Sequence, residues 1–121
     1  MSEWDVVYSY TREQALQDGV LLDVSKMAKE AGIKYPTAVT AAVWSIIETF
    51  PERCGQSVEG RLWDTLFLFR MAASKQTGQE VQFKVGYQQE EGVQETALWG
   101  WCGPGDTEDP VLTIMVEGED Y

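Results

Sequence analysis

Apolar residues recur at helical spacing between Ser57 and Lys75. One stripe is formed by Leu62, Leu66, Phe69 and Ala73, and a second by Trp63, Phe67, Leu68 and Met71. A helix that is apolar around most of its circumference must be covered on more than one side. The pattern therefore predicts a long helix, with Ser57 as its N-cap, around which the other elements pack.

The sequence upstream predicts three further helices. Thr11-Arg-Glu-Gln14 has the form of a capping box, which starts a short helix that ends near Gln17. Ser25 is expected to cap a second short helix from Lys26 to Ala31. Pro36 precedes a third, longer helix, and proline is favoured at the first helical position. This helix is predicted to run from Thr37 to Phe50, with its buried face made by Val39, Val43, Ile46, Ile47 and Phe50.

The apolar period changes to two after Gly78, which is typical of half-buried strands. Strands are predicted at 81–87, 93–102 and 111–116, joined by turns at 88–92 and 103–106. We therefore expect a single α+β domain over residues 1–121. Its N-terminal helices, two short and two long, would pack on one face of a three-stranded antiparallel β-meander.

Composition narrows the class of protein. A chain of 121 residues with 44% hydrophobic residues and five tryptophans is typical of one globular domain. No apolar run approaches the roughly 18 residues that a membrane span needs, so no membrane partner is expected. The acidic start, Met1 to Asp5, lacks the features of a signal peptide, and this favours a cytoplasmic location.

The negative charge is concentrated at the C-terminal end. The net charge is −11, from 20 acidic and 9 basic residues. No Lys or Arg follows Lys84, whereas the acidic residues beyond it are Glu90, Glu91, Glu95, Asp106, Glu108, Asp109, Glu117, Glu119 and Asp120. Direct binding to nucleic acid is disfavoured, because phosphates require cations. A basic protein surface is the better candidate partner.

The chain contains no histidine, which excludes Ser-His-Asp and Cys-His catalysis and histidine metal sites. Catalysis would have to use carboxylates, Lys, Tyr or Cys. Cys54 and Cys102 are too few and too far apart for a structural zinc site, and we interpret them as free thiols. A disulfide or a reactive thiol is the alternative. The sequence predicts no cofactor.

Several blocks, in order along the chain, carry a family resemblance: Tyr10-Thr-Arg, Asp18-Gly-Val-Leu-Leu-Asp-Val-Ser25, Gly60-Arg-Leu-Trp-Asp64, Cys102-Gly-Pro-Gly-Asp106, Pro110-Val-Leu-Thr-Ile-Met115 and Gly118-Glu-Asp120. Together they resemble a family of small acidic proteins of unknown function from bacteria, phages and plasmids. The family supplies no activity and no catalytic residues. The resemblance implies a setting in mobile elements, where small acidic proteins often inhibit host defence.

Three local groups of residues are candidate sites. Arg61 and Asp64 are interpreted as a helical ion pair of spacing three, with a polar functional pair as the alternative. The turn that holds Asp106, Glu108 and Asp109 lacks the full spacing of a calcium loop, so we predict a solvated acidic turn and no metal. Two tryptophans spaced by two share a strand face. For this pair, Trp99 and Trp101, we favour a place in the core under the helices, and an outward interface patch is the alternative.

These observations predict a non-enzymatic binding protein from a mobile element. As an inhibitor of the anti-CRISPR or anti-restriction type, it would block a host nucleic-acid-directed defence system by mimicking nucleic acid. The partner surface would comprise the nine C-terminal carboxylates and the two tryptophans named above. The alternatives are a structural module that dimerises through the stripe of Trp63, Phe67 and Met71, and, with least support, an enzyme that uses carboxylates or Cys102.

Overall fold

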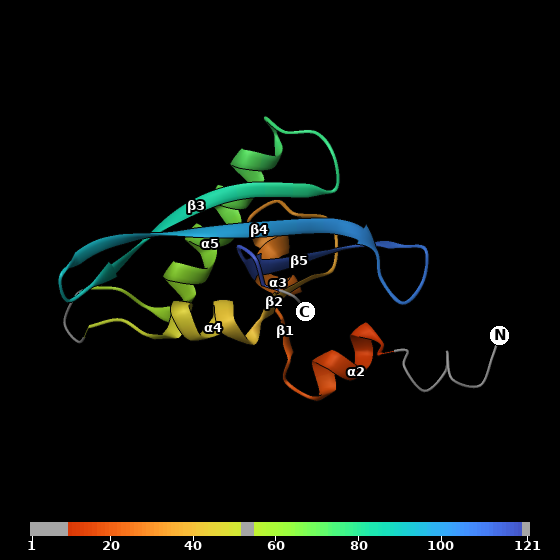
Figure 1. Ribbon diagram of the computed structural model, residues 1–121, viewed down its shortest axis with the longest axis horizontal. Coiled ribbons are helices and arrows are strands. Elements are labelled where there is room, and N and C mark those ends of the chain that lie inside the picture. The colour runs from red at the N-terminus through yellow and green to blue at the C-terminus, as the bar shows by residue number, and fades with distance from the viewer. Residues whose placement is uncertain (1–9, 52–54, 120–121) are drawn as a thin grey trace.

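The computed structural model describes residues 10–51 and 55–119 (Figure 1). In chain order the described elements are α2 (Arg12–Gln17), β1 (Leu21–Asp23), α3 (Ser25–Glu30), β2 (Thr37–Thr40), α4 (Ala41–Glu48), α5 (Val58–Ala73), β3 (Glu80–Gln89), β4 (Gly92–Pro104) and β5 (Pro110–Val116). The five strands form one sheet in the order β1-β2-β5-β4-β3. Strands β2 and β5 are parallel, and the other neighbours are antiparallel.

The α+β class is confirmed, but the predicted architecture is wrong. The sheet has five strands and is mixed, so it is not a three-stranded antiparallel meander. Strands β1 and β2 extend the meander on its β5 side, because Val39 lies opposite Ile114 in the parallel pair. The helices also do not share one face, since α2 packs on the face opposite to α3, α4 and α5.

The segment predicted as the start of a long helix, residues 37–40, is strand β2. All four of its residues are buried, as expected for a central strand covered on both faces. The side chain of Thr40 accepts a hydrogen bond from the amide of Val43 at 3.3 Å, so Thr40 is the N-cap and the helix begins at Ala41. Two threonines and a valine in four residues favour extended backbone, and pairing on both sides stabilises it.

Side-chain alternation divides the core between the two faces of the sheet. The larger cluster lies under α3, α4 and α5 and includes Val39, Leu98 and Ile114. The neighbouring position of β2, Ala38, points to the other face, where it packs with Ala15 of α2 and Leu21 of β1. The face away from α5 therefore has a helix only beside β1 and β2 among the described residues.

The helix caps and the C-terminal strands largely agree with the sequence predictions. Thr11 and Gln14 form the predicted capping box, and the hydroxyl of Ser57 accepts a hydrogen bond from the amide of Gly60 at 3.0 Å at the start of α5. Ser25 opens α3, although its N-cap is Val24 and the Ser25 hydroxyl bonds Asp23 instead. The three C-terminal strands are confirmed, and β4 runs along the long axis of the molecule (Figure 1). The weak alternation from Val6 to Tyr10 predicts a short strand or an extended lead-in, and of these residues only Tyr10 is among the described ones.

Candidate binding site at the β3–β4 hairpin

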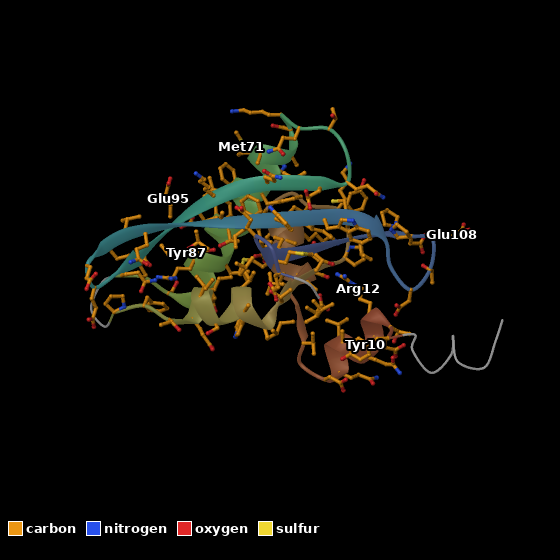
Figure 2. All side chains as sticks on the ribbon, in the orientation of Figure 1. Tyr10, Arg12, Met71, Tyr87, Glu95 and Glu108 are labelled. Atoms are coloured by element: carbon orange, nitrogen blue, oxygen red, sulfur yellow. The ribbon has the colours of Figure 1, made fainter. Side chains whose placement is uncertain are left out.

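The C-terminal carboxylates do not gather on one surface. Glu90 and Glu91 form the turn between β3 and β4, whereas Glu108 lies in the turn between β4 and β5. Glu95 and Glu108 are near opposite ends of the sheet (Figure 2). Glu117 lies beside the middle of β4, because its amide donates to the carbonyl of Ala97 at 3.1 Å. Asp120 is outside the described residues.

Among the described partner-binding acids that were predicted, two make side-chain hydrogen bonds to distant segments of the chain. The carboxylate of Asp106 accepts hydrogen bonds from the amides of Arg12 and Glu13, at 2.7 and 3.0 Å, at the start of α2. The carboxylate of Glu119 accepts from the hydroxyl of Thr40 at 2.8 Å and from the amide of Val116 at 2.9 Å. Both acids therefore join distant parts of the fold. Within the described ranges, no group of three His, Cys, Asp or Glu side chains is placed to hold a metal ion.

The interpretation of Trp99 and Trp101 as core under the helices is wrong. Leu98 and Gly100 point toward α5, so the two tryptophans lie on the opposite face of β4. Both are half-buried there. The ring of Trp101 lies over Gly103, where an added Cβ would be 2.5 Å from the ring. The outward interface patch thus stays a prediction.

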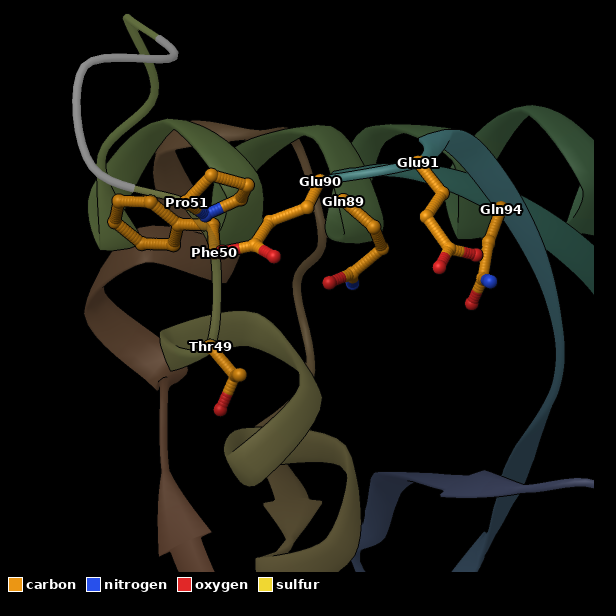
Figure 3. Close-up of a pocket in the computed structure, with 7 residues that line it drawn as sticks. All are labelled: Thr49, Phe50, Pro51, Gln89, Glu90, Glu91 and Gln94. Atoms are coloured by element: carbon orange, nitrogen blue, oxygen red, sulfur yellow. The ribbon is translucent and has the colours of Figure 1, made fainter.

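A shallow cavity of about 310 Å³ lies where the end of α4 approaches the β3–β4 hairpin (Figure 3). We call it the hairpin pocket, and it is lined by Thr49, Phe50, Pro51, Gln89, Glu90, Glu91 and Gln94. The hairpin turn contains only Glu90 and Glu91, because Gln89 pairs with Gly92. Gly92 has a φ of 115°, a value that favours glycine and closes the turn. The sequence thereby places two carboxylates at the tip.

The two walls of the hairpin pocket come from distant segments. Pro51 prevents α4 from continuing and restricts Phe50 to extended backbone, which carries both residues away from the helix. Gln94 is opposite Tyr87 in the sheet and so shares the face that points toward the helices. Glu95 points to the other face and does not line the pocket. In Figure 3 the side chain of Glu90 extends toward Phe50 and Pro51, those of Glu91 and Gln94 lie beside each other, and Gln89 lies between the two groups.

Arg61 of α5 connects the two walls, and its role was missed by the sequence interpretation. Its side chain is only 3% exposed. The guanidinium donates hydrogen bonds to the carbonyl oxygens of Ile46 in α4, at 2.8 Å, and Gln88 in β3, at 3.1 Å. Its carbon also lies 5.1 Å from the centre of the Phe50 ring. An exposed ion pair with Asp64 was expected, but this guanidinium is a buried connection between elements.

The side chain of Tyr87 completes the buried surroundings of Arg61. The Tyr87 hydroxyl lies 2.6 Å from that of Thr65, and the centre of its ring lies 4.8 Å from the guanidinium carbon of Arg61. Burial raises the pKa of Tyr87 above its ordinary value, opposed by the hydrogen bond to Thr65 and the positive charge of Arg61. Arg61 and Thr65 lie on the same buried face of α5 as Leu62, Leu66 and Phe69. Their burial would have been indicated by the helical spacing if polar residues had been included in the pattern.

The remaining sequence candidates are placed as follows. Cys102 is a free, half-buried thiol, and Cys54 lies outside the described residues. Burial raises the pKa of the Cys102 thiol, which keeps it protonated at neutral pH, the opposite of an activated nucleophile. No helix in the described part of the chain combines the length and the apolar character that a membrane crossing requires.

The fold and the hairpin pocket define an α+β protein with an acidic recess beside a mixed sheet. A family model described as a family of unknown function (DUF6573) matches residues 1–120, and the chain belongs to this family. The resemblance to a family of unknown function is thereby confirmed. No curated protein and no solved structure matches the chain.

Proposed function

We propose that this is a non-enzymatic, cytoplasmic binding protein that docks its β3–β4 hairpin on a basic protein surface. The observation that carries the proposal is the composition of the hairpin pocket. Two carboxylates and two amides, from Glu90, Glu91, Gln89 and Gln94, face an aromatic ring and a proline, and no Lys or Arg is among the described residues that line the space. Such a recess suits the side chain of a partner's Lys or Arg.

The chemistry of recognition has two parts. The carboxylates of Glu90 and Glu91 accept charge-assisted hydrogen bonds from a guanidinium or an ammonium group. The aliphatic stem of the same side chain packs on Phe50 and Pro51. The charge of Arg61, whose guanidinium carbon lies 5.1 Å from the centre of the Phe50 ring, reduces the negative potential in the pocket. Two carboxylates face the pocket against one buried cation, which is itself hydrogen-bonded to backbone carbonyls.

The partner class follows from the charge distribution. A basic surface that accepts this acidic hairpin is typical of proteins that bind nucleic acid. The resemblance to proteins of mobile elements favours a component of a host defence system as the partner, so that this protein would act as an inhibitor of the anti-CRISPR or anti-restriction type. Mimicry by all nine C-terminal carboxylates is not what we propose, because Asp106 and Glu119 make internal hydrogen bonds. The proposed competition with nucleic acid is limited to the hairpin end.

The test is capture from a bacterial host lysate on the immobilised protein, at low and high salt, with identification of retained proteins by mass spectrometry. Retention of a basic nucleic-acid-binding protein at low salt, its release at high salt, and its displacement by added duplex DNA or RNA are expected. The double variant Glu90→Gln, Glu91→Gln should lose this capture. A matched control with the same change of charge, Glu108→Gln with Asp109→Asn, should retain it. Equal loss in both variants, or capture of no basic protein, would contradict the proposal.

A second candidate function is homodimer formation through α5. The stripe predicted as a dimer surface is partly uncovered in the described structure, where Met71 is 45% exposed and Trp63 stacks on Phe67 at 5.0 Å between ring centres. Exposed apolar residues grouped in this way are typical of contact surfaces. Sedimentation equilibrium decides the question: a dimer that Met71→Gln weakens supports this function, and a strict monomer excludes it.

A further inference from the structure

Two cavities adjoin each other on a part of the surface that has no described lining residue in common with the hairpin pocket. Both are lined by the loop of residues 32–35 between α3 and β2, so we call them the Tyr35 cavities. The larger, of about 500 Å³, is completed by Ser25, Lys29 and Pro36. The smaller, of about 270 Å³, is completed by residues of α5, β3 and β4 that include Phe69, Arg70, Val81 and Cys102.

The walls of the Tyr35 cavities are largely apolar. Ile33 lines both, and the smaller cavity adds the ring of Phe69 and the side chains of Val81 and Cys102. Tyr35 also lines both cavities and is 45% exposed. Covering apolar walls that are in contact with water by an apolar group is favourable, because it removes apolar surface from water.

The charged residues around the Tyr35 cavities are all basic. Lys29, Lys34 and Arg70 line them, and no Asp or Glu is among the described lining residues, although the chain has 20 acidic residues. Within the part of the chain that the structure describes, none of these three cations makes a hydrogen bond or an ion pair. Their donors are therefore free to bind an anion.

The position of Arg70 depends on a glycine. Gly32 has a φ of 94°, and a Cβ added there would lie 2.9 Å from the guanidinium carbon of Arg70. The missing side chain leaves room for the guanidinium to lie on the backbone of the loop. The Arg70 guanidinium is thereby held at the smaller cavity. Its planar arrangement of five donors is suited to hydrogen bonding with a carboxylate.

We infer that the Tyr35 cavities bind a small organic anion with an apolar body, such as an alkyl or aryl carboxylate. The apolar body covers Phe69, Val81 and Cys102, and the carboxylate binds Arg70 and Lys34. The dimensions agree with this class, because each cavity is within or just below the usual range for small-molecule sites. Recognition of an anion also separates this site from the hairpin pocket, which suits a cation.

The first experiment compares three probes of equal chain length on the whole protein: octanoate, 1-octanol and octyltrimethylammonium. Chemical shifts of backbone amides locate each probe. Octanoate is expected to shift the signals of Gly32, Lys34 and Cys102 with at least tenfold higher affinity than 1-octanol. The cationic probe should not bind there. Equal binding of the three probes at these residues, or shifts of octanoate elsewhere only, would overturn the inference.

Charge variants supply the second readout. Lys34→Gln with Arg70→Gln should weaken octanoate binding at least tenfold, whereas Lys26→Gln, an exposed position of α3 that lines neither cavity, should not change it. In a Cys54→Ser background, Cys102 is the sole thiol, and octanoate should slow its reaction with iodoacetamide. Unchanged affinity in the double variant would contradict the inference. Octanoate binding should survive Glu90→Gln with Glu91→Gln, so failure here and failure of the proposed function are distinguishable.

Discussion

The guanidinium of Arg61 is placed against the ring of Tyr87, with 4.8 Å between its carbon and the ring centre. The same guanidinium donates to backbone carbonyls of α4 and β3. A single buried cation on α5 therefore connects α4 and β3, the two elements that lead into the walls of the hairpin pocket. This arrangement makes the geometry of an acidic surface recess depend on a positive charge in the interior.

Replacement of Arg61 by lysine should destabilise the protein although the charge is kept. An ammonium group cannot reach both carbonyl oxygens and face both rings, so a buried charge loses part of its hydrogen bonding, and we expect a loss of roughly 2–4 kcal/mol. Urea unfolding followed by tryptophan fluorescence measures it. The matched control is Arg70→Lys at an exposed position, expected to change stability by less than about 1 kcal/mol. A loss of stability for Arg61→Lys as small as that of the control would show that the contacts of the Arg61 guanidinium are not important for stability.

Replacement of Asp106 by alanine should loosen α2. Its carboxylate accepts from the amides of Arg12 and Glu13, and loss of a capping side chain costs about 1 kcal/mol. Amide hydrogen exchange at Arg12 and Glu13 should accelerate together with a small fall in stability. Glu108→Ala, at an exposed position of the same turn, serves as the control and should leave exchange in α2 unchanged. Equal exchange rates in the two variants would refute the capping role.

Replacement of Gly100 by alanine should disturb the contact between β4 and α5. An added Cβ would lie 2.1 Å from Cε1 of Phe69, and overpacking of a buried site costs roughly 1–3 kcal/mol. Thermal unfolding should show a clear fall in Tm. Addition of Phe69→Leu should recover part of it, because the ring that collides is removed. The control Gly86→Ala meets only Cγ1 of Val93, a side chain that is 65% exposed and free to rotate.

The stability of the protein should depend on the ionisation of Tyr87 at alkaline pH. Burial raises the pKa of Tyr87 above its ordinary value of 10.0 in the folded state, so the unfolded state loses this proton first. The stabilising contribution is complete below about pH 10 and falls as the pH rises through the folded pKa.

Tyr87→Phe removes this ionisation and also the hydrogen bond to Thr65, so at neutral pH it should be less stable by about 1 kcal/mol. Above pH 10 the difference from the wild type should shrink, because only the wild type loses the Tyr87 contribution. Urea unfolding at several pH values between 7 and 11 measures both effects. A difference that stays constant over this range would contradict the raised pKa.

Elements that are fixed by local chemistry could be predicted from the sequence. Thr11 with Gln14 and Ser57 with Gly60 are contacts between residues three apart, and the alternation at 81–87 is a property of one strand. The order of the sheet could not be predicted in this way. Thr37 pairs with Leu112, and nothing in residues 37–40 indicates a partner so far along the chain. Without that partner, a helix from Thr37 was the natural interpretation.

The candidate site also has one part that the local sequence predicts and one part that depends on tertiary folding. The charge at Glu90 and Glu91 was visible in the sequence, and so was the turn that carries them. The opposing wall was not, because Phe50 was assigned to the buried face of a helix and meets the hairpin only through tertiary folding. Arg61 was misinterpreted for a related reason. A cation beside Asp64 suggests a surface pair, and the carbonyl groups that it bonds in the interior leave no trace in the sequence.

The position of β5 between β2 and β4 has a consequence for synthesis of the chain. The strand that joins the two halves of the sheet is the last of the five strands to leave the ribosome. Until residues 110–116 emerge, β1 and β2 have no connection through the sheet to the β3–β4 hairpin. The nascent chain therefore exposes two open strand edges of β2 and β4, which are sites for incorrect pairing. Folding of the complete sheet is a late event that follows translation of β5.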